Sequence, residues 1–313
     1  MQAIPHILAL TSPLFLLAGI GYALVRWFMW PKAVSDALTR FVFAIAVPAL
    51  LFRLMSGFSR LPPVDARLLV AYFGGCLLVF ALGRVTAHRL FAMDGVAQSV
   101  FAVGGIFANN LLLGIPLAKI ILGDAALPAV SLVLVFNSLL LWTLVTVSVE
   151  WARTRHVSLA GFAETLRNVV TNPVVASILL GTAWGWAGAP LPDIADRTLD
   201  LVGQAAVPLS LIALGMGLAE FGVRDGIRES AALCVLKLAV QPLVVYALAR
   251  LLALPPLETQ AIVMLASLPV GANVYLMARE FRTLEGPVAA SLVLSTAVAA
   301  ATTPIVLALA AGG

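Results

Sequence analysis

Charged residues are scarce in this chain of 313 residues: they make up 11% of it, against about 25% in a typical soluble domain. Hydrophobic residues make up 62%, more than the surface of a water-soluble protein can accommodate. The composition therefore excludes a soluble enzyme. The 24 Gly and 18 Pro follow no strict period and are too few for a collagen-like or low-complexity chain. What remains is a membrane protein that crosses the bilayer several times.

Residues that carry chemistry are also few. Both cysteines, Cys76 and Cys234, lie inside apolar runs, so a disulfide framework has no support. The three histidines, His6, His88 and His156, are dispersed and form no metal-binding cluster. The chain has neither a phosphate-binding loop nor a hydrolase or metalloprotease motif, and it has no basic run. We expect no enzymatic activity, no cofactor, no metal and no nucleic-acid partner.

Long apolar runs fill the sequence. A helix that crosses about 30 Å of hydrocarbon needs about 20 residues, so the chain divides wherever charges, Gly and Pro cluster. Ten spans result, at 6–27, 36–57, 66–90, 96–118, 125–150, 168–188, 198–219, 229–251, 257–278 and 286–310. The first is predicted to be a retained helix rather than a signal peptide, because no basic residue precedes it. The sequence thus predicts an all-α polytopic membrane protein with ten transmembrane helices.

Lysine and arginine are distributed unevenly between the two sets of loops. The loops after spans 1, 3, 5, 7 and 9 hold twelve, and the opposite loops hold six. Because cytoplasmic loops are enriched in basic residues, we expect both termini to lie outside the cytoplasm.

The two halves of the chain repeat each other at a shift of 160 residues. The shift aligns Thr11-Ser12-Pro13 with Thr171-Asn172-Pro173, Ala46-Val47-Pro48 with Ala206-Val207-Pro208, and Ser131-Leu132-Val133-Leu134 with Ser291-Leu292-Val293-Leu294. Chance is the alternative, since Ala, Leu and Val are common. Five spans per half is an odd number, so the second half would enter the membrane from the opposite side. We therefore predict a first repeat at 1–150, a cytoplasmic linker at 151–167 and an inverted second repeat at 168–313, as in many secondary transporters.

Spans 4 and 9 contain residues that break helices, and each has an asparagine beside the break. Proline removes a backbone donor, glycine permits unwound backbone, and asparagine can satisfy the groups that lose helical partners. Unwound backbone survives within a membrane only in protein or beside a wet cavity. We predict two broken crossover helices that form a substrate site from Asn109, Asn110, Gly114, Pro116, Pro269, Gly271 and Asn273. The prolines elsewhere in the spans are interpreted as ordinary kinks.

The predicted substrate of this site is an anion. All fifteen acidic residues lie in loops or within about a turn of a span end, which disfavours an exchangeable cation at the membrane centre. The N-terminal end of a half-helix has free N–H groups and a positive partial charge. These features suit a carboxylate.

Lys237 is the only ionisable residue near the centre of a span. It should face the protein interior with a partner, because a lysine at this depth costs about 2.5 kcal/mol or more. It could attract the anion or change protonation during transport, or it could be a structural cation that satisfies the carbonyl ends of the broken helices. Gln241 and Gln204 could support the same cavity, or could be hydrogen-bonding contacts between helices.

The broken spans resemble the auxin efflux carrier family. Asn109-Asn110-Leu111-Leu112-Leu113-Gly114-Ile115-Pro116-Leu117 is similar to the N-T-L-x-x-G-I-P-L stretch of that family. Leu268-Pro269-Val270-Gly271, followed by Tyr275 and Ala278-Arg279-Glu280-Phe281, resembles its second crossover. Lys237, five residues before Pro242, matches a basic residue of the family. Ala108 stands where plant members have a proline, and the central loop is short, as in the bacterial organic-acid transporters.

This resemblance implies a scaffold of spans 1, 2, 6 and 7, through which the protein would form a homodimer, and a moving transport unit of spans 3–5 and 8–10. It implies a secondary transporter in the bacterial inner membrane that moves a small carboxylate, such as malonate, malate or an auxin-like acid, by alternating access. Its partners would be that anion and the lipid bilayer.

Two other functions are considered. A sodium-coupled organic-anion symporter of the bile-acid-carrier type has the same broad fold, but the absence of mid-membrane carboxylates weakens this interpretation. A membrane sensor or intramembrane enzyme would need a signalling domain or a buried nucleophile with its base, and the sequence shows neither.

Overall fold

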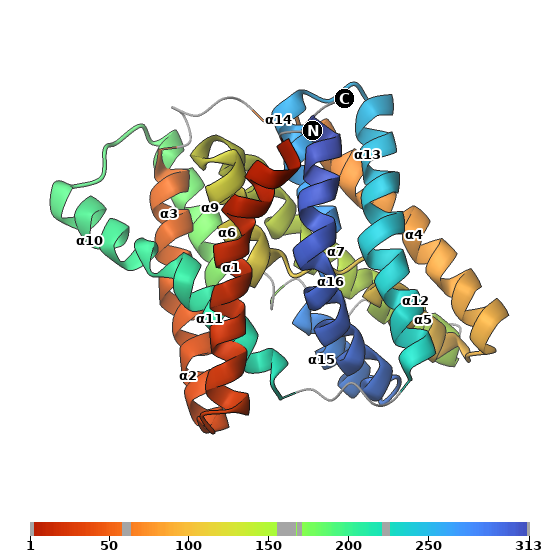
Figure 1. Ribbon diagram of the computed structural model, residues 1–313. Coiled ribbons are helices and arrows are strands. Elements are labelled where there is room, and N and C mark those ends of the chain that lie inside the picture. Colours follow the sequence, from red (N-terminus) through yellow and green to blue (C-terminus); the bar gives the residue numbers. More distant parts are fainter. Residues whose placement is uncertain (1–2, 58–63, 155–166, 168–170, 221–225, 312–313) are drawn as a thin grey trace.

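The computed structural model describes residues 3–57, 64–154, 167, 171–220 and 226–311. Within these ranges the protein is all-helical and has no strand, although Ala108 and Val270 form one isolated antiparallel bridge. Figure 1 shows a bundle of helices in which α7 lies between two groups. The chain is therefore an α-helical protein, as the sequence predicts.

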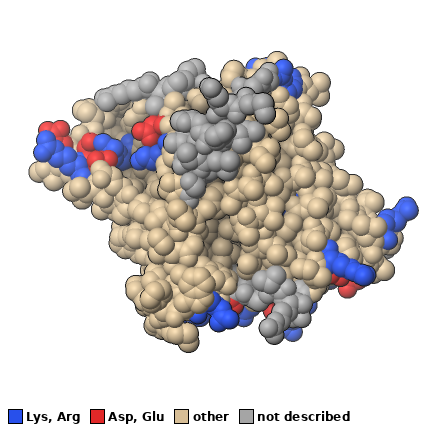
Figure 2. All heavy atoms as spheres, in the orientation of Figure 1, with Lys and Arg blue, Asp and Glu red and all other residues tan. Residues whose placement is uncertain are grey.

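Six helical stretches in the described residues are long and apolar enough to cross a membrane: Lys32–Ser56, Arg67–Phe91, Asp124–Arg153, Asp193–Leu218, Ile227–Leu251 and Glu285–Ala310. Four shorter helical stretches are also apolar: Phe15–Arg26, Gly95–Gly104, Asn110–Leu122 and Pro173–Trp186. Figure 2 shows a broad band without charged side chains, with the visible charges near its margins. Such a band suits a bilayer. The count of ten spans and the inverted repeat stay predictions.

The first half of the chain contains α1 to α7. The helices are α1 (Ala3–Arg26), α2 (Lys32–Phe41), α3 (Val47–Ser56), α4 (Arg67–Phe91), α5 (Gly95–Gly104), α6 (Ile115–Leu117) and α7 (Leu127–Thr154). Short turns of π-helix connect some of them: η1 (Val42–Ala46), η3 (Asn110–Gly114) and η4 (Ala118–Leu122). A 3-10 turn, η5 (Asp124–Ala126), precedes α7. Together η3, α6 and η4 form one continuous helical stretch, Asn110–Leu122.

The second half contains α9 to α16. They are α9 (Pro173–Trp186), α10 (Asp193–Gln204), α11 (Ala206–Leu218), α12 (Ile227–Val235), α13 (Gln241–Leu251), α14 (Pro256–Ser267), α15 (Ala272–Glu280) and α16 (Glu285–Ala311). A π-helical turn, η6 (Leu236–Val240), joins α12 to α13. The predicted linker at 151–167 lies mostly outside the described residues, and α7 continues to Thr154.

Glycines let two pairs of helices pack with their backbones nearly in contact. Helix α1 packs on α11, and α3 packs on α9. A Cβ atom on Gly215 would lie 1.8 Å from the carbonyl oxygen of Ala18, and one on Gly181 would lie 2.7 Å from that of Phe52. Small residues at such crossings are typical of membrane helices, because close packing is what holds helices together in lipid. These four helices, with α2 and α10, form the group on the left of Figure 1.

A second group of helices contains both helix breaks. Helix α4 packs on α5 and α13, α14 packs on α13 and α16, and α12 packs on α16. Helix α7 packs on α5 and α14, and α16 also contacts α1 of the first group. Side chains from α4, α5 and α14, including Tyr72, Phe101 and Leu265, are fully buried in the core of this group.

Three of the π-helical turns lie directly before a proline. Turns η1, η3 and η6 precede Pro48, Pro116 and Pro242, each at the first or second position of the next helix. A proline ring clashes with the carbonyl one turn earlier and provides no N–H. A wider turn relieves that clash while the helix continues. These prolines therefore adjust the helices rather than end them.

Candidate functional site

Two helices are each interrupted by an unwound segment, and backbone hydrogen bonds join the two segments where they cross. Helix α5 ends at Gly104, and helical structure resumes at Asn110. Helix α14 ends at Ser267, and α15 begins at Ala272. The Asn109 N–H donates to the carbonyl of Pro269 at 2.9 Å, and the Gly271 N–H donates to the carbonyl of Phe107 at 2.8 Å. We call residues 105–109 and 268–271 the two crossovers. The backbone is unwound in both regions where the sequence predicts breaks.

Gly271 is required by the close approach of the two crossovers. A Cβ atom at this position would lie 2.9 Å from the carbonyl oxygen of Ala108 and 3.1 Å from its carbon. Both distances are shorter than an ordinary van der Waals contact, so a side chain would push the crossovers apart. The N–H of the adjacent Val270 donates to the Ser295 hydroxyl at 3.0 Å, which fixes the second crossover against α16.

Side chains from neighbouring helices satisfy carbonyls that the breaks leave without helical partners. Lys237 is fully buried, and its Nζ donates to the carbonyl of Ala266 at 2.6 Å. Thr303 donates to the next carbonyl, that of Ser267, at 3.0 Å. Both carbonyls lie in the last turn of α14, where a helix has no N–H to offer them.

Gln241 satisfies a backbone carbonyl of the other crossover. Its Nε2 donates to the carbonyl of Ile106 at 2.9 Å and to the sulfur of Cys76 at 3.4 Å. Lys237 and Gln241 are one helical turn apart, on η6 and at the start of α13. A single helical segment, η6 with the start of α13, therefore braces both crossovers.

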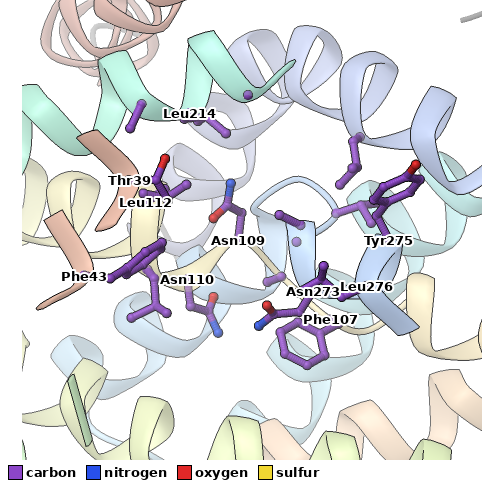
Figure 3. A pocket seen from close by; sticks show the side chains of 18 of the residues that line it. Thr39, Phe43, Phe107, Asn109, Asn110, Leu112, Leu214, Asn273, Tyr275 and Leu276 are labelled. Carbon is purple, nitrogen blue, oxygen red and sulfur yellow. The ribbon is translucent and has the colours of Figure 1, made fainter. Parts of the chain in front are cut away.

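A cavity of about 310 Å³ opens beside the crossing point. It is lined by residues of both crossovers and of the helices that follow them, together with residues of α2, α7, α9, α11 and α16. Figure 3 shows Asn109, Asn110 and Asn273 around the crossing chains, with the amides of Asn110 and Asn273 directed toward one another. Apolar side chains, including Phe43, Phe107 and Leu214, make up much of the remaining wall.

The asparagine amides have unused hydrogen-bonding capacity. Asn110 is buried, and its Nδ2 donates to the hydroxyl of Tyr72 at 3.3 Å. Within the described part of the chain, its Oδ1 and the Oδ1 of Asn137 are buried without a hydrogen-bond partner. A buried polar atom without a partner costs about 1–3 kcal/mol, so a water or a ligand hydroxyl that donates a hydrogen bond to these oxygens recovers that free energy.

The cavity also receives the N-terminal ends of two helices. The first turn of the stretch Asn110–Leu122 and the first turn of α15 both line it. The N–H groups of a first turn have no carbonyl partner within their own helix, and the dipole places a positive partial charge there. Two such ends and several amide side chains form an environment that suits a carboxylate group.

The charged groups that line the cavity lie at its solvent-facing end. The Nζ of Lys32 is 2.5 Å from the Oε2 of Glu220 and 3.1 Å from the Oδ1 of Asp36. The side chains of Lys32 and Asp36 are 64% and 62% exposed, so this part of the cluster lies at the edge of the cavity, whereas the Glu220 side chain is 25% exposed.

Only some of the predicted site residues line the cavity. Asn109, Asn110, Gly271 and Asn273 do so. The remaining predicted residues occupy other positions: Gly114 packs on Leu265 and Leu268, Pro116 is buried at the start of α6, Pro269 contributes its carbonyl to the crossing, and Lys237 and Gln241 brace the crossovers from outside the cavity wall. Gln204 lies elsewhere, exposed at the end of α10, where its amide donates to Asp200 at 2.9 Å.

The sequence interpretation overlooked several residues that line the cavity. Asn137 on α7 and Thr296 on α16 are buried polar residues in largely apolar helices, and the amide of Asn137 within an apolar span is a signal that could have identified that residue. Lys32 and Glu220 are 188 positions apart in sequence, so no local pattern predicts their ion pair.

Comparison with known proteins gives a match along almost the whole chain. Residues 6–307 match the family described as "Membrane transport protein". A protein of Rhizobium meliloti (strain 1021) named "Putative malonate transporter" is 27% identical over 304 residues, which cover 95% of this chain and 93% of that protein.

Two more distant relatives are also named as carriers or transporters. "Auxin efflux carrier component 8" of Arabidopsis thaliana is 19% identical over 333 residues, covering 88% of this chain and 89% of the plant protein. An "Uncharacterized transporter" of Methanothermobacter thermautotrophicus is 24% identical over 258 residues, covering 80% of each chain.

Proposed function

Since the chain belongs to the membrane transport protein family, the family of the auxin efflux carriers, we propose that it moves a small carboxylate anion by alternating access. The protein is an integral membrane transporter and not an enzyme. The observation that carries the proposal is the cavity beside the two crossovers, where asparagine amides and two helix N-terminal ends converge, while the lining carboxylates Asp36 and Glu220 are ion-paired with Lys32.

The chemistry of the cavity supports an anion of modest size. Asn109, Asn110 and Asn273 place amide donors at the crossing chains, and apolar side chains form much of the rest of the wall. The donors would bind a carboxylate, and the apolar wall would contact the remainder of the ligand. One relative is named for malonate and another for auxin, and both names are consistent with a site that has donors for a carboxylate and an apolar wall. Malonate, malate and an auxin-like acid are therefore the proposed candidates.

The proposed mechanism separates the helices into two units. The scaffold would comprise α1, α2, α3, α9, α10 and α11, and the transport unit would comprise α4–α7 and α12–α16. The scaffold corresponds to the predicted spans 1, 2, 6 and 7. The transport unit corresponds to the predicted spans 3–5 and 8–10. The packing of α1 on α11 and of α3 on α9 supports the first unit, and the crossing hydrogen bonds support the second.

The proposed topology has ten transmembrane helices in two inverted repeats, with both termini outside the cytoplasm. The cavity would then open toward the cytoplasm, since Lys32 and Glu220 belong to the loops that are rich in basic residues. The proposed location is the bacterial inner membrane, and the scaffold would form a homodimer.

Transport by the purified protein in liposomes tests the proposal. We expect radiolabelled malonate, malate or an indole carboxylate to accumulate in protein-containing liposomes faster than in empty ones, and an inside-positive potential to increase that uptake. Failure of all three anions to move in either direction would contradict the proposed substrate class. Repeating the assay with and without sodium distinguishes the sodium-coupled alternative, for which uptake would depend on sodium.

A further inference from the structure

Lys237 is a fully buried lysine without a counter-ion among the described residues. Among the described residues, no carboxylate forms an ion pair with it, and its Nζ donates to the Ala266 carbonyl instead. That carbonyl lies in the last turn of α14, the negative end of the helix dipole, which stabilises a cation. The nearby polar side chains of Tyr72, Cys76 and Gln241 are neutral groups. The helix end therefore lowers the free energy of the ammonium without neutralising its charge.

Lys237 is attached to the crossovers and not to the scaffold. Its hydrogen-bond partner Ala266 lies in the last turn of α14, two residues before the second crossover, and Gln241 on the same segment binds Ile106 of the first. The segment η6 packs on α4, α14 and α16, all of the proposed transport unit. Any displacement of the crossovers across the membrane would therefore carry this charge with it.

The other buried or half-buried charges of the unit lie farther from the middle of their helices than Lys237 does. Glu258 is in the first turn of α14. Arg84 lies in the last third of α4 and donates to the hydroxyls of Ser99 and Ser148 and to Gln98. Charges near the membrane surface cross little of the transmembrane field when a helix shifts, whereas a charge near the centre crosses more. Lys237 is therefore the charge of the unit most exposed to that field.

We propose that Lys237 is a fixed positive charge through which the membrane potential returns the empty transport unit to the cytoplasmic side. This inference rests on the proposed function, because it requires a moving unit that carries an anion. With the cytoplasm negative, the empty unit carries one positive charge and is drawn inward. A bound monoanion cancels that charge, so the loaded unit moves with little dependence on voltage.

The charge balance of the cycle is complete. Outward movement of the unit with a monoanion transfers no net charge, and inward return of the empty unit transfers one positive charge. Their sum equals the export of one negative charge. With a dianion, the loaded step also carries one negative charge outward, so the potential favours both steps. One elementary charge that crosses the whole field changes the ratio of the two states by about 50-fold per 100 mV, which is the upper limit here.

The experiment measures charge movement without any substrate. Voltage steps applied to giant proteoliposome patches should produce a transient current in the wild-type protein, as the empty units redistribute. Lys237→Gln should abolish the transient, because glutamine can donate to a carbonyl but has no charge, and Lys237→Arg should retain it. Arg89→Gln is the matched control: it removes an exposed charge at the end of α4 and should leave the transient unchanged.

A second variant keeps the lysine in place. The thiol of Cys76 on α4 already accepts a hydrogen bond from Gln241, one turn from Lys237. Cys76→Asp would place a carboxylate there and make the region neutral, so it should also suppress the transient. An unchanged transient in both charge-neutralising variants would overturn the inference, as would a wild-type protein that transports an anion but shows no transient. Failure of the proposed function is a separate result: a wild-type transient without any carboxylate transport.

Discussion

The two crossovers approach each other so closely at Gly271 that they leave no room for a side chain there. Its missing side chain would lie 2.9 Å from the Ala108 carbonyl, so Gly271→Ala should separate the crossing backbones. We expect a loss of about 1–3 kcal/mol of stability, typical of overpacking, together with weaker anion binding. Thermal unfolding and ligand binding of the detergent-solubilised protein measure both effects.

The matched control for this change is Gly19→Ala in α1. No atom lies within 4 Å of the Cβ position there, so the substitution should be neutral or slightly stabilising. Equal destabilisation by both substitutions would show that the close approach at Gly271 is not the cause.

Lys237 was compatible with two roles on sequence grounds, and its geometry favours a structural contribution. The Nζ–Ala266 hydrogen bond at 2.6 Å satisfies a carbonyl that α14 cannot satisfy itself. Lys237→Met should therefore lower stability more than Lys237→Gln, because methionine leaves the carbonyl buried and unpaired, at a cost of about 1–3 kcal/mol. Thermal unfolding measures the difference. Equal or higher stability of the Met variant would contradict this role.

The asparagines of the site were predictable from sequence because polar amides are unusual beside Gly and Pro in apolar runs. Asn137 was not identified, although it too is a polar residue in an apolar helix, because no helix breaker lies near it. The carbonyl partners of Lys237 and Gln241 could not be predicted from the sequence, since any unwound carbonyl nearby could have accepted those hydrogen bonds.

At the scale of elements, the segment η6 with the start of α13 holds the crossovers. Gln241→Leu would leave the Ile106 carbonyl without its donor at 2.9 Å, so residues 105–109 should open more often. We expect faster amide hydrogen exchange in that crossover, which mass spectrometry of the corresponding peptides measures. Leu243→Ala, two residues along the same helix at a position 66% exposed, is the control and should change nothing there. Unchanged exchange in the Gln241 variant would count against the bracing role.

Helix boundaries differ from the predicted spans where local capping decides them. Span 6 was predicted from residue 168, but α9 begins at Pro173, because the Asn172 side chain accepts from the N–H of Val174 at 2.9 Å. Span 7 was predicted from 198, but the helical stretch begins at Asp193, and Ala205 interrupts its regular hydrogen bonding between α10 and α11. Hydropathy indicates that a segment is apolar, whereas capping and bends depend on single side chains.

At the scale of the whole molecule, the proposed topology places residues 29 and 194 on opposite sides of the membrane. Met29 is 79% exposed and Ile194 is 84% exposed, so a cysteine at either position would be accessible. In intact bacterial cells, a membrane-impermeant thiol reagent should label Ile194→Cys but not Met29→Cys, and permeabilised cells should show both. A Cys234→Ala background removes the half-buried native thiol. The reverse pattern would contradict both termini lying outside.

The transporter class was predictable because composition and helix-breaking motifs depend on physical properties of short segments. The packing of the segments against one another was less predictable from the sequence. The ion pair of Lys32 with Glu220 and the convergence of seven helical regions on one cavity arise from tertiary packing, which has no local signature.

Equilibrium binding of radiolabelled malonate, malate and an indole carboxylate to the purified protein tests most directly whether the crossover cavity is the anion site. We predict that at least one binds the wild-type protein and that Asn110→Leu and Asn273→Leu each weaken that binding about 10-fold or more, since hydrogen bonds to charged groups contribute about 1.5–3 kcal/mol. Thr302→Val, on α16 at a position that lines a separate pocket, should bind like the wild type. Undiminished binding by both folded asparagine variants would contradict the account.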